Sequence, residues 1–164
     1  MGAAAEDQGR GFQPVAPPRP LPALDLTDAA GQPAGLDAYR GKVVLVNFWA
    51  TWCGPCVEEL PALSRLQARL SGPDFTVIAV SGDRTGPEAV TPFLGQHGIT
   101  GLPVLYDRTL ASGRALHVTG LPTSILLDRD GREVGRVLGT LDWDSQAAVR
   151  PIEDAIKGRA PESG

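Results

Sequence analysis

The chain has 164 residues, enough for one domain with a sizeable core, and its 42% hydrophobic and 21% charged residues are ordinary values for a globular protein. Its net charge of -4 and its lack of a basic cluster argue against a nucleic-acid surface. No apolar stretch approaches the roughly 20 residues that span a bilayer. The first ten residues have neither a basic nor an apolar segment, so they do not resemble a signal peptide.

The predicted elements begin with a proline-rich segment over residues 1–22, which indicates a flexible tether or extended arm. Residues 23–39 predict a short β-hairpin around a glycine-containing turn. Residues 42–50 form a near-continuous run of β-branched and aromatic side chains, which is typical of a central strand buried on both faces. A helix is expected after this strand, up to about Leu70.

The sequence pattern of the second half of the chain predicts an α/β arrangement that continues to the last helix. We expect a strand at 75–82, a helix at 86–98, a strand at 102–107, a helix at 108–118 that Gly113 interrupts, a hairpin at 123–139 around Asp130 and Gly131, and a helix at 142–158. This order predicts a sheet with helices on both faces. The expected organisation is a single domain over residues 23–158 and a flexible tail over residues 159–164.

The chain has only two cysteines, Cys53 and Cys56, in the stretch NFWATWCGPCVEEL. A secreted scaffold that depends on disulfides carries more than one bridge, and a closed structural zinc site needs four ligands. The two histidines, His97 and His117, are not at zinc-finger spacing and are expected on the surface or in loops. These observations favour a redox pair over a metal clip or a structural staple, and no metal or organic cofactor is implied.

Helical spacing gives the two cysteines unlike surroundings. At about 100° per residue, Cys56 shares one arc with four leucines, so its sulfur is expected to face the core. Those leucines are Leu60, Leu63, Leu66 and Leu70. Cys53 comes at the helix start, where unpaired N–H groups and the positive end of the helix dipole stabilise a thiolate, so we expect it to be exposed and reactive. Gly54 and Pro55 keep the intervening turn tight.

Glu59 lies on the apolar arc, whereas Glu58 lies on the solvated face of the same helix. One interpretation is that Glu59 escapes to solvent as a helpful acid in the first turn. The other is that Glu59 accepts a proton from Cys56, three residues back on the same face. Geometry alone leaves both open.

Three stretches resemble one family. FWATWCGPC resembles the active site of the thioredoxin superfamily, and VEELPAL and GLPTSILLDRDGREVGRVLG resemble its TlpA/ResA-like branch, the bacterial thiol-disulfide oxidoreductases that work outside the cytoplasm. The resemblance covers roughly residues 22–158. It implies a thioredoxin fold with an N-terminal β-hairpin extension and an inserted helix and strand, at about residues 83–106, that would shape a substrate groove.

The resemblance also assigns roles to residues. Cys53 and Cys56 would form the catalytic dithiol, and Pro122 would follow a cis peptide bond that exposes the backbone of Leu121 to a substrate. Asn47 stands where cytoplasmic thioredoxins carry a buried aspartate, and Glu59 resembles its replacement in this branch. Trp52, Gly54, Pro55 and Leu121 are the candidate substrate-binding residues, with Trp52 also explicable as packing over Cys53. Phe48 and Trp49 are expected in the core.

The implied function is reduction of protein disulfides in the periplasm or elsewhere outside the cytoplasm, through a mixed disulfide with Cys53 that Cys56 resolves. The implied partners are disulfide-containing proteins and a membrane electron donor of the DsbD/CcdA type. The resemblance also implies a monomer whose N-terminal membrane anchor is absent from this chain. Biogenesis of cytochrome c or of a cytochrome oxidase copper site is the implied process, although Thr123 replaces the acidic residue of the cytochrome c relatives. The competing prediction is a Cu(I) chaperone that uses both thiolates.

Overall fold

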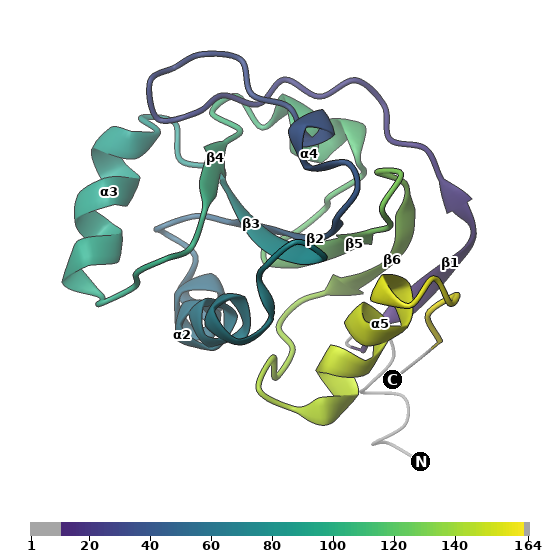
Figure 1. Ribbon diagram of the computed structural model, residues 1–164. Helices are drawn as coiled ribbons and strands as arrows, with labels where there is room; N and C mark the ends of the chain where they lie inside the picture. Colours follow the sequence, from purple (N-terminus) through teal and green to yellow (C-terminus); the bar gives the residue numbers. More distant parts are fainter. Residues whose placement is uncertain (1–10, 163–164) are drawn as a thin grey trace.

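The computed structural model describes residues 11–162 and forms one six-stranded mixed sheet with helices on both faces (Figure 1). Its strand order is β1-β6-β5-β2-β3-β4. The strands are β1 (Gln13–Arg19), β2 (Val43–Trp49), β3 (Phe75–Ser81), β4 (Val104–Tyr106), β5 (Thr123–Leu127) and β6 (Glu133–Leu138). The helices are the 3-10 helix η1 (Leu36–Tyr39), α2 (Gly54–Leu70), α3 (Pro87–Gln96), α4 (Ala111–Ala115) and α5 (Gln146–Ile156).

The centre of the sheet follows from continuous apolar sequence. Every residue of β2 and of β3 is buried, and the two strands run parallel in register from Val43 opposite Phe75 to Trp49 opposite Ser81. β5 pairs with β2 in the antiparallel direction. Because β2 has neighbours on both sides and helices on both faces, all its side chains must be accommodated in the core, as the sequence predicted.

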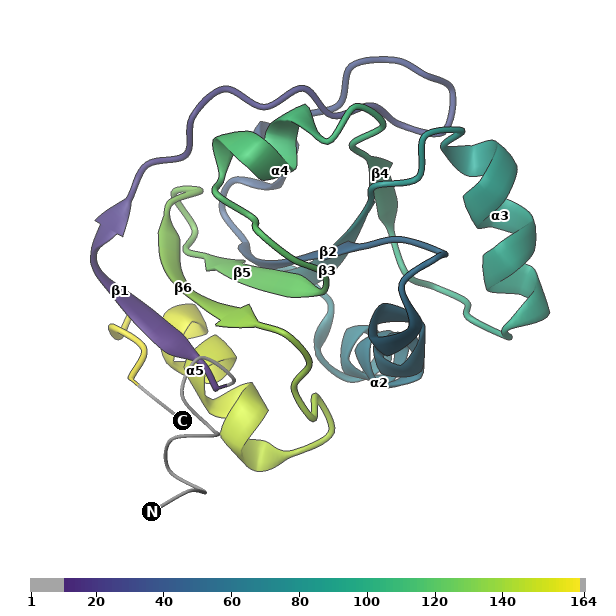
Figure 2. The ribbon, with the colours of Figure 1, turned by 180° about the vertical axis from the view of Figure 1, so that it is seen from behind.

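Two cores lie on opposite faces of the sheet. The larger one contains the buried side of α2 and of α5, together with Trp49, Cys53 and Cys56. The smaller one packs α4 and the segment around η1 against the other face. Figure 2 shows how the segment after β1 passes over the sheet on the α4 side before it enters β2.

The β5–β6 hairpin and the insert agree with prediction. The hairpin closes between Asp128 and Arg132, and Gly131 supplies the left-handed backbone (φ 79°) that this three-residue connection requires. The insert contributes α3 and the edge strand β4, which runs parallel to β3. In the described part of the chain, no helix has both the length and the apolarity needed to cross a membrane.

The predicted flexible tether over residues 1–22 is wrong for its second half. Gln13–Arg19 form β1, which pairs with β6 at the edge of the sheet, where prolines are tolerated. Phe12 is buried against Gly135, and a Cβ at position 135 would lie only 2.0 Å from the Phe12 ring. Residues 1–10 lie outside the described part of the chain.

The predicted N-terminal hairpin over residues 23–39 is reduced to a single bridge. Thr27 pairs with Pro33 and also with Tyr106 at the edge of β4, and the expected second strand is replaced by η1. The backbone of Thr27 exchanges two hydrogen bonds with Tyr106, of 3.0 and 2.9 Å. The first arm therefore finds its partner on the main sheet, which a local reading of the segment could not reveal.

Candidate active site

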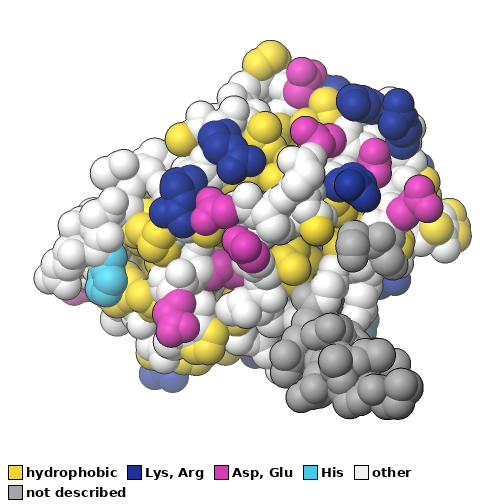
Figure 3. Space-filling model, turned by 90° about the horizontal axis from the view of Figure 1, so that it is seen from below, with side chains coloured by type: hydrophobic (Ala, Val, Ile, Leu, Met, Phe, Trp, Pro, Cys, Tyr) yellow, Lys and Arg dark blue, Asp and Glu magenta, His cyan; other side chains and the backbone are white. Residues whose placement is uncertain are grey.

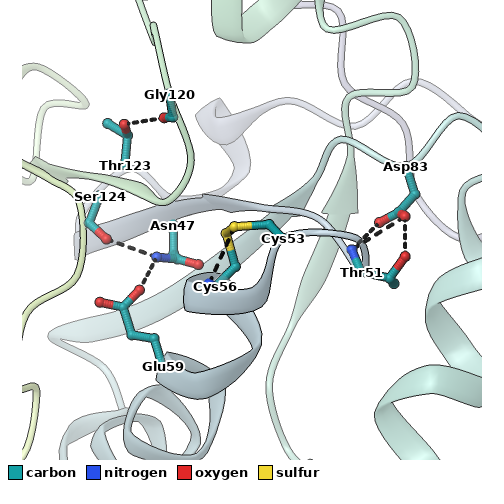
Figure 4. The surroundings of a disulfide bond; sticks show 9 residues. All are labelled: Asn47, Thr51, Cys53, Cys56, Glu59, Asp83, Gly120, Thr123 and Ser124. Carbon is teal, nitrogen blue, oxygen red and sulfur yellow. Dashed lines mark hydrogen bonds between the residues drawn. A yellow bond between two sulfur atoms is a disulfide. The ribbon is translucent and has the colours of Figure 1, made fainter.

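Cys53 and Cys56 lie at the start of α2 and are joined by a disulfide, with their Cα atoms 5.3 Å apart (Figure 4). Cys53 is the N-cap residue, and its Sγ accepts a hydrogen bond from the Cys56 backbone N–H at 3.3 Å. Pro55 occupies the first turn, where its missing N–H costs little. The helix start thus places hydrogen-bond donors and the positive end of the dipole beside the Cys53 sulfur.

The predicted asymmetry of the two cysteines is present, but Cys53 is less exposed than expected. Its exposed fraction is 8%, against 1% for Cys56. Because Cys53 caps the helix, its sulfur turns back over the first turn instead of pointing outward. Access to Cys53 comes through a pocket of about 420 Å³, whose lining also includes Trp52 and Leu121.

The loop before β5 borders the same pocket. The Leu121–Pro122 peptide bond is cis, as the resemblance implied. The Thr123 hydroxyl donates a hydrogen bond to the Gly120 carbonyl at 2.7 Å (Figure 4), and the Pro122 carbonyl accepts one from Gly139 N–H at 2.9 Å. The loop is thereby held against β5 and β6, with Gly120 and Leu121 lining the pocket beside Cys53.

Glu59 is buried, with an exposed fraction of 5%, while Glu58 is exposed. The exposed Glu58 is as expected, and of the two interpretations left open for Glu59 the structure excludes escape to solvent. The carboxylate accepts three hydrogen bonds: Oε2 from Leu141 N–H and Trp143 Nε1–H, both at 2.9 Å, and Oε1 from Asn47 Nδ2–H at 3.3 Å. Burial raises the pKa of the Glu59 carboxyl, and these three hydrogen bonds oppose the rise.

Asn47 connects Glu59 to β5. Its Nδ2 donates both to Glu59 and, at 2.9 Å, to the Ser124 hydroxyl (Figure 4). Because a carboxylate can only accept, the amide must present its NH₂ group to Glu59. Asn47 and Ser124 are a register pair on neighbouring strands β2 and β5, so the sheet itself aligns this contact.

A second groove, of about 740 Å³, runs along the other side of α2 and includes Pro55 and Glu59 in its lining. Figure 3 views this side of the molecule and shows acidic and basic side chains interspersed on it. Arg65 forms a bidentate ion pair with Asp144 across the groove, at 2.8 and 3.1 Å. Glu59 therefore has a polar groove on one side and the buried sulfur region on the other.

Sequence reasoning missed a hydrogen-bonded clamp on the other side of Cys53. Asp83 follows β3, is buried, and its carboxylate accepts hydrogen bonds from Thr51 N–H and Thr51 Oγ1–H (Figure 4) and from Ser81 Oγ–H. Thr51 lies in the turn that the Cys53 N–H closes onto the Ala50 carbonyl at 3.2 Å. A polar residue two positions after a buried parallel strand was the available signal, since sites gather at the carboxyl ends of such strands.

The structure also shows the exposure of the remaining residues that the sequence analysis singled out. Trp52 is 66% exposed, whereas Phe48 and Trp49 are buried. His97 and His117 are exposed. Within residues 11–162, no three side chains of His, Cys, Asp or Glu come together in a way that could hold a metal ion. The predicted role of the insert is not met at the pocket beside Cys53, because none of residues 83–106 lines it.

Comparison with known proteins decides the family, because residues 16–156 match the model of the Redoxin family. The chain belongs to the Redoxin family. It is 36% identical over 118 residues to thiol-disulfide oxidoreductase ResA of Bacillus thuringiensis (strain Al Hakam), covering 72% of this chain and 67% of the relative. ResA of Bacillus subtilis (strain 168) is 32% identical over 120 residues, covering 73% and 66%.

Solved structures give the same fold for this Redoxin-family chain. A thiol:disulfide interchange protein of the thioredoxin family from Chlorobium tepidum superposes with a TM-score of 0.69 at 27% identity, covering 87% of this chain and 99% of that one. A secreted thiol-disulfide isomerase from Corynebacterium glutamicum, at 20% identity, shares the fold alone, with a TM-score of 0.75 and coverage of 91% and 93%. The protein has a thioredoxin fold and is a thiol-disulfide oxidoreductase.

Proposed function

We propose that this enzyme reduces disulfides of protein substrates outside the cytoplasm, through the Cys53–Cys56 pair. The observation that supports this most directly is the disulfide at the start of α2, in which one sulfur borders an open pocket and the other lies in the core. An inert staple has no use for such a difference between its sulfurs. A redox pair needs this difference, because one cysteine must be accessible to the substrate disulfide and the other must be shielded until it resolves the mixed disulfide.

Cys53 acts first in the proposed mechanism. In the reduced enzyme its thiolate is stabilised by the Cys56 N–H and by the start of α2. The thiolate attacks one sulfur of the target disulfide, the target S–S bond breaks, and the departing target thiolate takes up a proton. The product is a mixed disulfide between Cys53 and the substrate, with Trp52 and the backbone of Leu121 contacting the substrate segment.

Cys56 completes the reaction. Glu59 accepts the Cys56 proton, directly or through one water, and the Cys56 thiolate attacks the Cys53 sulfur. The mixed disulfide breaks, the second target sulfur leaves as a thiolate and takes up a proton, Glu59 returns its proton to solvent, and the enzyme holds its own disulfide. Two electrons have then passed from the enzyme to the target. Asn47 keeps the Glu59 carboxylate in place and Pro122 shapes the substrate-contacting loop, so neither needs to react.

The family resemblance supports the remaining parts of the proposal. A membrane thiol-disulfide transporter would return the electrons, and an N-terminal anchor would keep the domain, as a monomer, at the membrane. Candidate substrates are the disulfides of apocytochrome c and of copper-site proteins in respiratory biogenesis. A Cys56→Ser variant, which stalls the mixed disulfide, would capture the natural substrate for identification by mass spectrometry.

The decisive test of direction is the reduction potential of the cysteine pair. By analogy with the Gly-Pro pair of thioredoxin we expect roughly -230 to -280 mV, whereas a value near -120 mV would identify an oxidant. Brief alkylation with limiting reagent should label Cys53 before Cys56 in the reduced enzyme. Stoichiometric binding of Cu(I) without metal-free disulfide reduction would instead favour the copper chaperone.

A further inference from the structure

The pocket beside Cys53 is lined mainly by apolar groups and has one charged residue, Arg114, in its lining. Its volume is about 420 Å³, which is enough for a large side chain and its flanking backbone. Phe48 and Val80 come from the central strands, and Leu110 and Val118 come from the segment between β4 and β5.

Leu110 is held in this wall in an unfavourable backbone conformation. Its φ of 64° lies in the left-handed region, which is rare and unfavourable for a residue with a γ-branched side chain. Asp107 holds the conformation: its carbonyl accepts the Leu110 N–H, and its carboxylate accepts the Ser112 and Gly113 N–H groups that follow. Strain that the surroundings enforce in this way is characteristic of functional positions.

Leu110 also remains exposed, at 42%, although it is a large apolar residue. Among residues 11–162 the exposed large hydrophobic side chains are Trp52, Leu110 and Leu138, and the first two both line this pocket with Cys53. Gly82 makes room for Leu110, because a Cβ at position 82 would lie 2.8 Å from the Leu110 Cδ2. Two exposed apolar walls beside a nucleophilic sulfur indicate a surface that is covered when a partner binds.

Arg114 lies one helical turn beyond Leu110, and its N–H donates to the Leu110 carbonyl at 3.0 Å. Its side chain is exposed and forms no ion pair within the described residues. The nearby Asp107 carboxylate is already engaged by backbone N–H groups of α4. The rim of the pocket therefore presents an uncompensated cation.

We propose that this pocket selects substrates, by receiving a large apolar side chain next to the reacting cysteine while Arg114 pairs with an Asp or Glu of the same segment. The preference rests on the proposed disulfide reduction. Apolar burial would supply most of the discrimination, whereas the exposed ion pair would contribute less and would fix the direction of the segment. The favoured partner is thus an extended protein segment that is apolar and acidic around its cysteine.

The test uses four single-cysteine peptides, each supplied as its symmetric disulfide. The residue after cysteine is Leu or Ala, and the next residue is Asp or Lys. The fully reduced enzyme is mixed with each peptide, and the second-order rate constant of a single turnover is measured by acid quenching and mass analysis. For the wild type we expect Leu to exceed Ala by about 10-fold and Asp to exceed Lys by about 3-fold at low ionic strength.

Two variants separate the contribution of Leu110, in the wall of the pocket, from that of Arg114, at its rim. Leu110→Ala should lower the Leu-over-Ala ratio by about 3-fold or more and leave the Asp-over-Lys ratio unchanged. Arg114→Glu should invert the Asp-over-Lys ratio and leave the Leu-over-Ala ratio unchanged. Arg150→Glu, which makes the same change of net charge on the exposed side of α5, should keep both wild-type ratios.

Equal rates for all four peptides with the wild type, or unchanged ratios in both variants, would overturn the selection by this pocket and leave the proposed function standing. A wild type that reduces none of the peptides, although its Cys53 still reacts with iodoacetamide, would overturn the proposed function and this selection with it. A changed Leu-over-Ala ratio in Leu110→Ala supports the apolar subsite, and inversion in Arg114→Glu supports the acidic partner.

Discussion

At the scale of single residues, the site depends on two buried carboxylates on either side of the cysteine pair. Glu59 receives two donors at 2.9 Å on Oε2 but only one, at 3.3 Å, on Oε1. Oε1 is therefore the oxygen with spare capacity to take a proton. Asp83 instead receives neutral donors from Thr51 and Ser81, and acts on the backbone that precedes Cys53.

Glu59→Gln should slow resolution of the mixed disulfide by roughly 10²-fold, the usual effect of removing a positioned general base. The glutamine keeps the shape of the side chain, so alkylation of Cys53 should change less. Stopped-flow reduction of a model disulfide measures the resolution step. Glu58→Gln is the matched control, and it should behave as wild type because Glu58 is exposed. Resolution at the wild-type rate in Glu59→Gln, or slower resolution in Glu58→Gln than in Glu59→Gln, would show that Glu59 is not the base and that its buried hydrogen bonds are only structural.

Asp83→Ala should lower the second-order rate constant for disulfide exchange by about 10-fold, because misplacement of a reacting group is costly. The physical cause is release of the Thr51 turn, which should appear as faster hydrogen exchange of the Thr51 amide. Asp83→Asn should restore part of both, since its carbonyl can still accept the Thr51 N–H.

Ser81→Ala is the control for Asp83, because it removes a donor to the same carboxylate without touching the Thr51 turn. Wild-type exchange kinetics in Asp83→Ala, together with an unprotected Thr51 amide, would mean that the clamp stabilises the turn without positioning Cys53.

At the scale of elements, the segments that follow β2 and β6 determine the surroundings of Cys53 and Glu59 at the start of α2. β2 delivers the chain directly into the Ala50–Cys53 turn, and α2 begins at Gly54. β6 leads into the segment that carries Leu141 and Trp143 to Glu59. The edge strand β1 pairs with β6, and Phe12, which directly precedes β1, packs on Gly135 of β6.

Phe12→Ala should lower the free energy of unfolding by about 3 kcal/mol, the usual cost of emptying a buried phenylalanine site. Phe12→Leu should cost less, since most of the apolar volume remains. Urea denaturation of the oxidised protein measures both. If Phe12→Ala is as stable as wild type, β1 contributes little to the stability of the domain, as expected of a flexible tether.

At the scale of the whole molecule, the reactive sulfur lies where the parallel strands β2 and β3 end and the loops from α4 and β5 converge. The pocket on one side of Cys53 is mainly apolar, and the groove on the other side of α2 is polar and reaches Glu59. Substrate contact and proton exchange can therefore occur from different directions.

The buried Glu59 also makes global stability depend on pH. Its pKa is raised in the folded protein, so the stabilisation it provides is complete below its unfolded-state pKa and is lost as pH rises through the folded-state pKa. Glutamine cannot ionise, so Glu59→Gln should gain stability relative to wild type as pH rises from about 5 to about 8. Urea unfolding of both oxidised proteins across this range measures the difference, and a difference independent of pH would contradict burial of the ionised carboxylate.

The sequence by itself determined the features that depend on local spacing. The buried strands β2 and β3 follow from continuous apolar runs, and the arc of leucines on α2 and the exposed Glu58 follow from the helical period of 3.6 residues. The difference between Cys53 and Cys56 was predictable for the same reason, because it depends on the helix start and on the leucine arc of the same helix.

Only the tertiary structure decided the features that join distant segments. Trp143 meets Glu59 across 84 positions, and Asp83 meets Thr51 across 32, through hydrogen bonds that no local pattern encodes. Likewise, β1 is held at the edge of the sheet by Phe12, which packs on Gly135. The absence of a side chain at position 135 leaves room for the Phe12 ring. Proline-rich sequence disfavours regular structure on its own, and burial against the rest of the sheet outweighs that preference.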